Sequence, residues 1–205
     1  MAVLEPEHRS NLKPHQAAEQ PGATELYTSE EFAVFAANYP DLQMEMTREG
    51  KIVIMPPSGG ESSNQSSIAG GRLFAWNDQH RLGFTFDANG GYNLPGGGTR
   101  APDASWVSRD RWEALTPEQK RKFLPLSPDF AVEVLSPTDS LLETRTKMVE
   151  YMASGTRLAW LINPRTKQVE IYRMGQDIEI LDAPVSLSGE EVLPGFVLNL
   201  EGILF

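Results

Sequence analysis

The chain has 205 residues, of which 40% are hydrophobic and 22% charged, so it is long enough to form one globular domain with a sizeable buried core. It contains no cysteine, which excludes disulfides and cysteine-ligated zinc and favours a cytoplasmic location. The formal net charge of −10 argues against a protein that coats nucleic acid, since such proteins are normally basic. It does not exclude an enzyme that gathers carboxylates at a metal site.

The N-terminal residues 1–23 are polar, contain prolines and follow no periodic pattern. They predict a flexible tail, followed by a single domain over residues 24–205. The tail has early acidic residues and no long apolar stretch, so it does not resemble a signal peptide. No segment approaches the roughly 20 apolar residues that cross a bilayer, and we expect no membrane contact.

The first elements expected in chain order are a helix and a hairpin. The helix covers residues 29–38, with Thr28 or Ser29 as its N-cap and acidic residues in its first turn. Residues 42–54 then alternate between apolar and polar side chains on either side of a turn at Gly50, which predicts two antiparallel strands.

The rest of the chain mixes helical and strand periodicity. The expected elements are a helix over 61–79, two strands around a glycine-rich turn over 83–108, a short helix with a loop over 111–122, a strand over 128–135, an amphipathic helix over 136–155, strands over 157–163, 168–174 and 177–181, and a closing hydrophobic segment over 192–204. Strands that bracket helices in this way predict an α/β or α+β sheet covered by helices.

Glu133 is the most informative residue of the expected strand over 128–135. Phe130, Val132 and Val134 face one way, so Glu133 faces the other. An ionised carboxylate in so apolar a strand is costly unless it is paired. The alternative is that this face of the strand is solvated, which would make Glu133 an ordinary surface residue.

Two further residues extend this observation. Asp103 lies in APDASWV at the start of a strand, and Lys147 lies on the polar side of the helix that follows Glu133. Two carboxylates on adjacent strands hold a hard divalent cation, and a nearby lysine orients water or stabilises negative charge, which together is what phosphodiester hydrolysis needs. The alternative for Lys147 is an i,i+4 surface pair with Glu143.

Several segments resemble a known family. PDASWV, PDFAVEVLSPTDSL, and KMVEYMASGTRLAWLINP followed by VEIYR are similar to the Uma-two family, and the resemblance runs from about Tyr27 to Phe205. This family belongs to the restriction-endonuclease-like superfamily with the PD-(D/E)XK signature. The resemblance implies an α/β fold with a mixed central sheet flanked by helices.

The resemblance also implies a set of site residues. Asp103 matches the aspartate of the PD element and Glu133 matches the acid of the second strand. The standard signature has a lysine two positions after that acid, where this chain has Leu135. Lys147 matches a lysine that has moved to the following helix. Glu61 resembles the acidic residue that many superfamily members carry on the first helix; its alternative is a helix N-terminal glutamate stabilised by the helix dipole.

Taken together, the resemblance implies a magnesium-dependent endonuclease acting on DNA, with Mn²⁺ as an alternative to Mg²⁺. Asp103 and Glu133 would bind the metal, Lys147 would orient the attacking water, and Glu61 would support metal or water. Nucleases that cut both strands often work as dimers, so a homodimer is a further expectation. The alternative function is a non-catalytic module that keeps the nuclease fold and binds a partner or nucleic acid, which the acidic balance and Leu135 favour.

Overall fold

The computed structural model describes residues 26–205, so the tail predicted over residues 1–23 lies outside the described part of the chain. Its elements follow in chain order: α1 (Ser29–Asn38), β1 (Gln43–Met46), β2 (Ile52–Met55), α2 (Gly60–His80), β3 (Gly83–Asp87), β4 (Tyr92–Asn93), β5 (Thr99–Arg100), β6 (Ala104–Ser108), α3 (Arg109–Glu113), the 3₁₀ helix η2 (Gln119–Arg121), β7 (Phe130–Val134), α4 (Leu141–Ala153), β8 (Leu158–Asn163), β9 (Gln168–Arg173), β10 (Glu179–Asp182), β11 (Ser186–Ser188) and β12 (Val197–Asn199).

Most predicted elements are present, and the differences lie in the loops. The glycine-rich turn expected between two strands contains two further short strands, β4 and β5. The closing segment contributes β12, which pairs with β11 as an antiparallel hairpin that the sequence pattern did not predict. No helix within residues 26–205 is long and apolar enough to cross a membrane.

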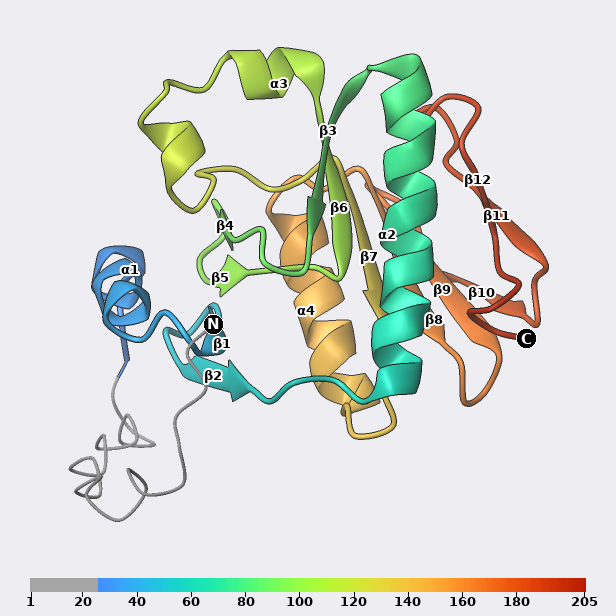
Figure 1. Cartoon of the computed structure of the whole chain (residues 1–205), viewed down its shortest axis with the longest axis horizontal. Helices are drawn as coiled ribbons and strands as arrows, with labels where there is room; N and C mark the ends of the chain where they lie inside the picture. The colour runs from blue at the N-terminus through green and yellow to red at the C-terminus, as the bar shows by residue number, and fades with distance from the viewer. Residues whose placement is uncertain (1–25) are drawn as a thin grey trace, which may run out of the picture.

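A six-stranded mixed sheet forms the centre of the molecule, in the order β10-β9-β8-β7-β6-β3 (Figure 1). β7 and β8 pair in parallel, whereas the other neighbouring pairs of this sheet are antiparallel. Parallel neighbours need a long crossover connection, and α4 supplies it between β7 and β8. The predicted mixed sheet flanked by helices is confirmed.

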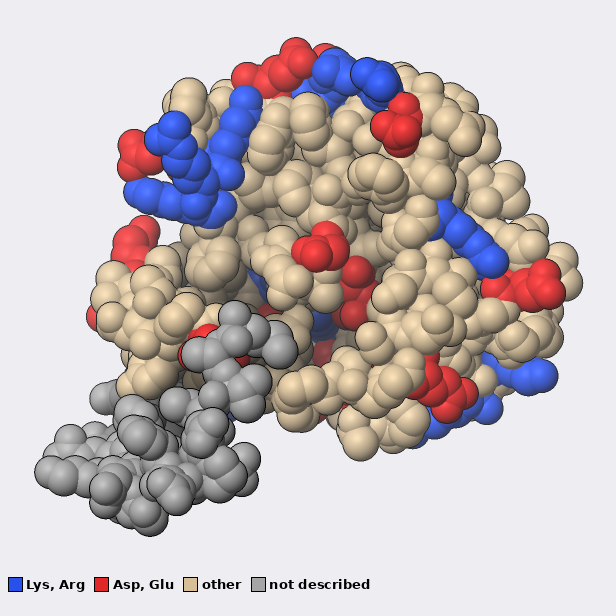
Figure 2. All heavy atoms as spheres, viewed as in Figure 1, with Lys and Arg blue, Asp and Glu red and all other residues tan. Residues whose placement is uncertain are grey.

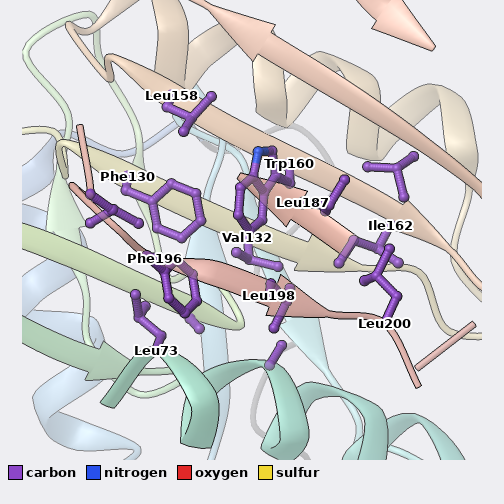
Figure 3. Packing of buried hydrophobic residues seen from close by; sticks show 14 of the residues in the cluster. Leu73, Phe130, Val132, Leu158, Trp160, Ile162, Leu187, Phe196, Leu198 and Leu200 are labelled. Carbon is purple, nitrogen blue, oxygen red and sulfur yellow. The ribbon is translucent and has the colours of Figure 1, made fainter. Parts of the chain in front are cut away.

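Two helices cover opposite faces of this sheet. α2 lies across one face together with the β11–β12 hairpin, and α4 lies on the other (Figure 1). The α2 face is an apolar core in which Trp160 stacks on Phe196 and meets Phe130 edge to face, with Leu73 contributed by the helix (Figure 3). Its side chains exclude water and so provide most of the hydrophobic stabilisation on this side.

A smaller sheet, ordered β2-β1-β5-β4, stands beside the central one and carries α1. α1 begins with the predicted N-cap, Thr28, whose side chain and that of Glu31 form a capping box. The hairpin predicted over residues 42–54 is present as β1 and β2. In β1 the structure buries both the apolar Met46 and the charged Glu45.

α4 is bounded as the sequence pattern indicates. The Ser140 side chain accepts a hydrogen bond from the Glu143 amide at the N-terminus. The helix ends before Gly155, which has φ +103°, a conformation that favours glycine. These ends fix where α4 passes over the sheet, and therefore which of its side chains point inward.

Candidate active site

Asp103 directly precedes β6, and Glu133 lies on the neighbouring strand β7. Ala104 pairs with Val132 in the antiparallel ladder between β6 and β7, so the next position along brings Asp103 opposite Glu133. Val132 packs in the core beneath α2, and side chains alternate between faces, so Glu133 points toward α4. This end of β6 and β7 is where the predicted acidic pair comes together.

Asp103 is half-buried and tied to the neighbouring strand. Its Oδ2 accepts a hydrogen bond of 2.7 Å from the backbone N–H of Val134. Burial raises the pKa of the Asp103 carboxyl above its ordinary value, and the negative charge of Asp139 raises it further, against the opposing effects of the Val134 amide and Lys147. The Val134 amide therefore fixes the position of the Asp103 carboxylate, while burial makes its deprotonated form less favourable.

Glu133 is buried, with only 7% of the residue exposed, so the solvated-face alternative is wrong. Its Oε1 accepts hydrogen bonds from the Tyr151 hydroxyl at 2.9 Å and from the Lys147 ammonium at 2.8 Å. Burial raises the pKa of Glu133 to about 7, with the charges of Asp103 and Glu45 adding to the rise and that of Lys147 opposing it. A carboxyl with such a pKa changes charge near neutral pH.

Lys147 does not lie on the outer face of α4. Its side chain is 13% exposed, and its Nζ lies 2.8 Å from Glu133, 2.7 Å from Glu45 and 3.3 Å from the carbonyl oxygen of Ala101. The predicted position off the buried side of the helix and the surface pair with Glu143 are both wrong. α4 is oriented so that Lys147 and Tyr151, which are four residues apart and therefore on the same side of the helix, both face the sheet.

The sequence reasoning missed a second group of buried charges beside the first. Glu45 on β1 contacts Arg100, which in turn contacts Glu150 on α4, at 3.1 Å and 2.7 Å. Burial alone would raise the pKa of Glu45, but the charges of Lys147 and Arg100 hold it below its ordinary value. Burial opposes the charge of Arg100, yet Glu150 and Glu45 raise its pKa. Glu45 therefore stays ionised. The ion pairs of Arg100 with Glu45 and Glu150 connect the small sheet to α4.

No local pattern marks Glu45 as part of the site. It occupies a polar position of an ordinary amphipathic hairpin, and its partner Lys147 lies about a hundred residues further along the chain. The β1–β5 pairing, through Met46 and Thr99, is what brings Glu45 beside Arg100. Only the tertiary arrangement of the two sheets reveals it.

Glu61 lies apart from these groups. It is exposed in the first turn of α2, and within residues 26–205 no hydrogen bond or ion pair joins it to Asp103, Glu133 or Lys147. The residue of α2 that acts on Asp103 is Ser66, whose hydroxyl lowers the pKa of that carboxyl. Glu61 instead lines a neighbouring pocket of about 400 Å³, with Leu135, Arg165 and the C-terminal residues.

The side chains in this region offer carboxylate oxygens rather than histidine or cysteine ligands, and such oxygens suit a small divalent cation. Within the described residues, no group of three or more histidine, cysteine, aspartate or glutamate side chains is arranged to hold a metal. Magnesium, however, is commonly held by one or two carboxylates completed by water. Tyr151 and Lys147 both contact Oε1 of Glu133, and Asp103 contributes a second carboxylate. Carboxylate oxygens are the donors that magnesium and manganese take, so the chemistry of the donor set fits either ion.

The surface above the site is partly open. Figure 2 shows a recess between α2 and the small sheet, with acidic and basic atoms visible inside it. Basic side chains gather elsewhere, over α3 and the segment that follows it, where Lys122 pairs with Glu118 and Arg109 with Glu113. A ligand would thus reach the buried charges from this side of the molecule.

Comparisons with known proteins bear on the fold and the family of the chain. The fold is shared with a solved structure, titled as a putative nuclease belonging to DUF820, from Anabaena variabilis ATCC 29413. Its TM-score is 0.71 at 22% sequence identity, with 87% of this chain and 97% of that chain covered. The molecule is thus an α/β protein that shares its fold with that structure. The sequence model of the Uma2 family, described as "Putative restriction endonuclease", matches residues 29–201, and the chain belongs to this family. No curated protein matches it.

Proposed function

We propose that this protein is a cytoplasmic, magnesium-dependent endonuclease that hydrolyses phosphodiester bonds of DNA. The observation that carries the proposal is the position of Lys147, whose ammonium lies 2.8 Å from Glu133 while Glu133 lies beside Asp103 on the neighbouring strand. A cation-binding carboxylate pair with an adjacent ammonium is the arrangement that phosphodiester hydrolysis requires. The family description and the nuclease-like fold support the same class of reaction.

In this proposal Asp103 and Glu133 would hold Mg²⁺, or Mn²⁺ in its place, with the backbone carbonyl near Val134 as a further oxygen donor. When bound, such a cation would polarise the phosphate and lower the pKa of water. Lys147 would orient the attacking water and stabilise the negative charge that grows on the phosphate. Glu61, at the entrance of the adjoining pocket, would act only through water or through the flanking substrate.

Cleavage assays test the proposal directly. Purified protein is incubated with supercoiled, linear duplex and single-stranded DNA, in Mg²⁺, in Mn²⁺ and in chelator. We expect metal-dependent cutting, and a fall of about 10²–10³ in rate for Lys147→Met, the size that removal of such an electrostatic group usually produces. Lys122→Met is the matched control, because its side chain is 70% exposed and, among residues 26–205, forms an ion pair only with Glu118.

One observation favours the second candidate, a non-catalytic nuclease-fold module. Lys147 has three donor hydrogens, and Glu45, Glu133 and the Ala101 carbonyl oxygen are three acceptors for them. A purely structural lysine would be satisfied in the same way. If the wild-type chain cuts no DNA with either metal, this module takes the place of the nuclease. Nucleases that cut both strands often work as dimers, so sedimentation with and without DNA tests the proposed homodimer.

A further inference from the structure

We propose that Glu45, on the N-terminal hairpin, is the positioning residue that holds the Lys147 ammonium over the carboxylate pair. The inference rests on the proposed nuclease function. Glu45 Oε1 lies 2.7 Å from Lys147 Nζ, on β1 of the small sheet, whereas Asp103 and Glu133 belong to the central sheet. The small sheet therefore contributes a residue to the site.

The contacts of Glu45 distinguish it from a metal ligand. Oε1 accepts from Lys147 and, at 2.9 Å, from the backbone N–H of Ala101. Oε2 accepts from Arg100 at 3.1 Å. Both oxygens are thus occupied by protein donors, and the residue is only 3% exposed. Its carboxylate serves to fix cations of the chain, not to bind one from solution.

Glu45 is itself held rigidly. Arg100 reaches from Glu45 to Glu150, which lies on α4 three residues after Lys147, almost one helical turn. The four side chains of Glu45, Lys147, Arg100 and Glu150 therefore connect β1, β5 and the same turn of α4. A buried carboxylate with this many fixed partners has little freedom, so it sets the position of the ammonium that contacts it.

The need for a second partner follows from what Glu133 is proposed to do. If Glu133 directs its carboxylate toward a cation, its hold on Lys147 weakens. Glu45 then keeps the ammonium in place, because its Oε1 contacts Nζ at 2.7 Å independently of Glu133. Lys147 can stabilise a phosphate only while its ammonium stays in position.

A merely structural role is the competing explanation, since Glu45 also ties the hairpin to α4. Glu150 provides the matched control. It is equally buried, at 6% against 3% exposed, and pairs with the same Arg100, but it has no contact with Lys147. Glu45→Gln and Glu150→Gln should therefore each weaken the ion pairs made by Arg100. Only Glu45→Gln removes the charge that contacts the Lys147 ammonium.

The kinetic test compares these two full-length variants in the DNA cleavage assay. For Glu45→Gln we expect kcat to fall by about tenfold or more, with the KM for DNA and the Mn²⁺ affinity changed by less than about twofold, the pattern of a group felt mainly in the transition state. For Glu150→Gln we expect kcat to fall by at most about threefold. Equal losses in both variants would overturn the inference, as would a loss confined to KM. If Glu45→Gln fails to fold, Glu45→Asp keeps the charge but withdraws it from Lys147, and the same split is expected.

A readout independent of cleavage is the ammonium signal of Lys147 in ¹⁵N-lysine NMR spectra of the metal-free protein, assigned by its loss in Lys147→Met. Hydrogen-bonded and buried, this ammonium should exchange slowly in wild type and in Glu150→Gln, and its signal should disappear into fast exchange in Glu45→Gln. Persistence of the signal in Glu45→Gln would overturn the inference. If the wild-type chain cleaves nothing while the signal behaves as expected, only the proposed function fails.

Discussion

The two faces of the central sheet differ although the same strands build both: each buries an apolar cluster, but the face beneath α4 also buries charged side chains. Beneath α2 the residues of β7 are Phe130, Val132 and Val134, which pack into a wholly apolar cluster. Beneath α4 the same strand presents Glu133, within reach of Lys147 and Tyr151. Every residue of β7 is nevertheless buried.

This difference separates stability from chemistry. The α2 face gains from excluding water, since each apolar group removed from solvent contributes favourably. The α4 face buries several ionised groups, which costs desolvation energy that ion pairing offsets only in part. A fold that needed only stability would gain from apolar residues there. We attribute the retained charges to the function of that face.

The largest expected effect on stability lies on the apolar face. Trp160→Ala removes a fully buried indole between Phe130 and Phe196, and should lower the free energy of unfolding by about 3–5 kcal/mol. Because Trp160 faces away from the carboxylates, the Mn²⁺ affinity of the folded variant should not change. Urea unfolding and calorimetry measure the two quantities. A loss of metal affinity at a temperature where the variant is folded would show that the faces are not independent.

A smaller effect is expected for Tyr151→Phe on the charged face. It removes the hydroxyl that donates to Glu133, a hydrogen bond to a charged group, and should cost about 1.5–3 kcal/mol of unfolding free energy above neutral pH. Tyr92→Phe is the matched control, because that buried hydroxyl bonds Ser105 on the same face, away from the ion pairs. Only Tyr151→Phe should weaken Mn²⁺ binding. Equal effects of both variants on metal affinity would contradict the separate role of Glu133.

The pH dependence of stability provides a finer comparison. The pKa of Glu133 is raised from an ordinary 4.5 to about 7 in the folded protein, so folding favours its protonated form. The stabilisation that this group contributes is complete below pH 4.5 and is lost as the pH rises through about 7. Metal-free Glu133→Gln should lack this decline, on the order of 3 kcal/mol, and should be the more stable of the two at pH 8. Parallel stability profiles from pH 4 to 8 would show that Glu133 is not perturbed.

Much of the fold could be predicted from periodicity and turn chemistry. The capped helix after Thr28, the alternating strand around Glu133 and the stop at Gly155 are local signals, and the structure shows all three. The direction in which α4 faces was not predictable in this way. Its apolar residues are spread around the helix, and a lysine is normally assigned to the solvent side.

The site divides along the same line. Asp103 and Glu133 could be located because each is a carboxylate at an otherwise apolar strand, in segments that resemble a family. The burial of Lys147 and the contribution of Glu45 depend on how two sheets and a helix pack, which no short segment encodes. Glu61, assigned by resemblance, lies at the neighbouring pocket without a contact to the other three.

The central claim is that Asp103 and Glu133 form a divalent-cation site, and metal binding measured by calorimetry tests it most directly. Wild-type protein and Asp103→Asn, which preserves the shape of the side chain, are titrated with Mn²⁺ and Mg²⁺ at pH 7.5, where the carboxylates can release their protons. The account predicts one bound cation for wild type, with proton release on binding. It also predicts an affinity lower by about tenfold or more for Asp103→Asn, the size of loss that follows when a residue that binds or orients a metal is removed. Equal affinity in the two proteins, or no binding to wild type, would contradict it.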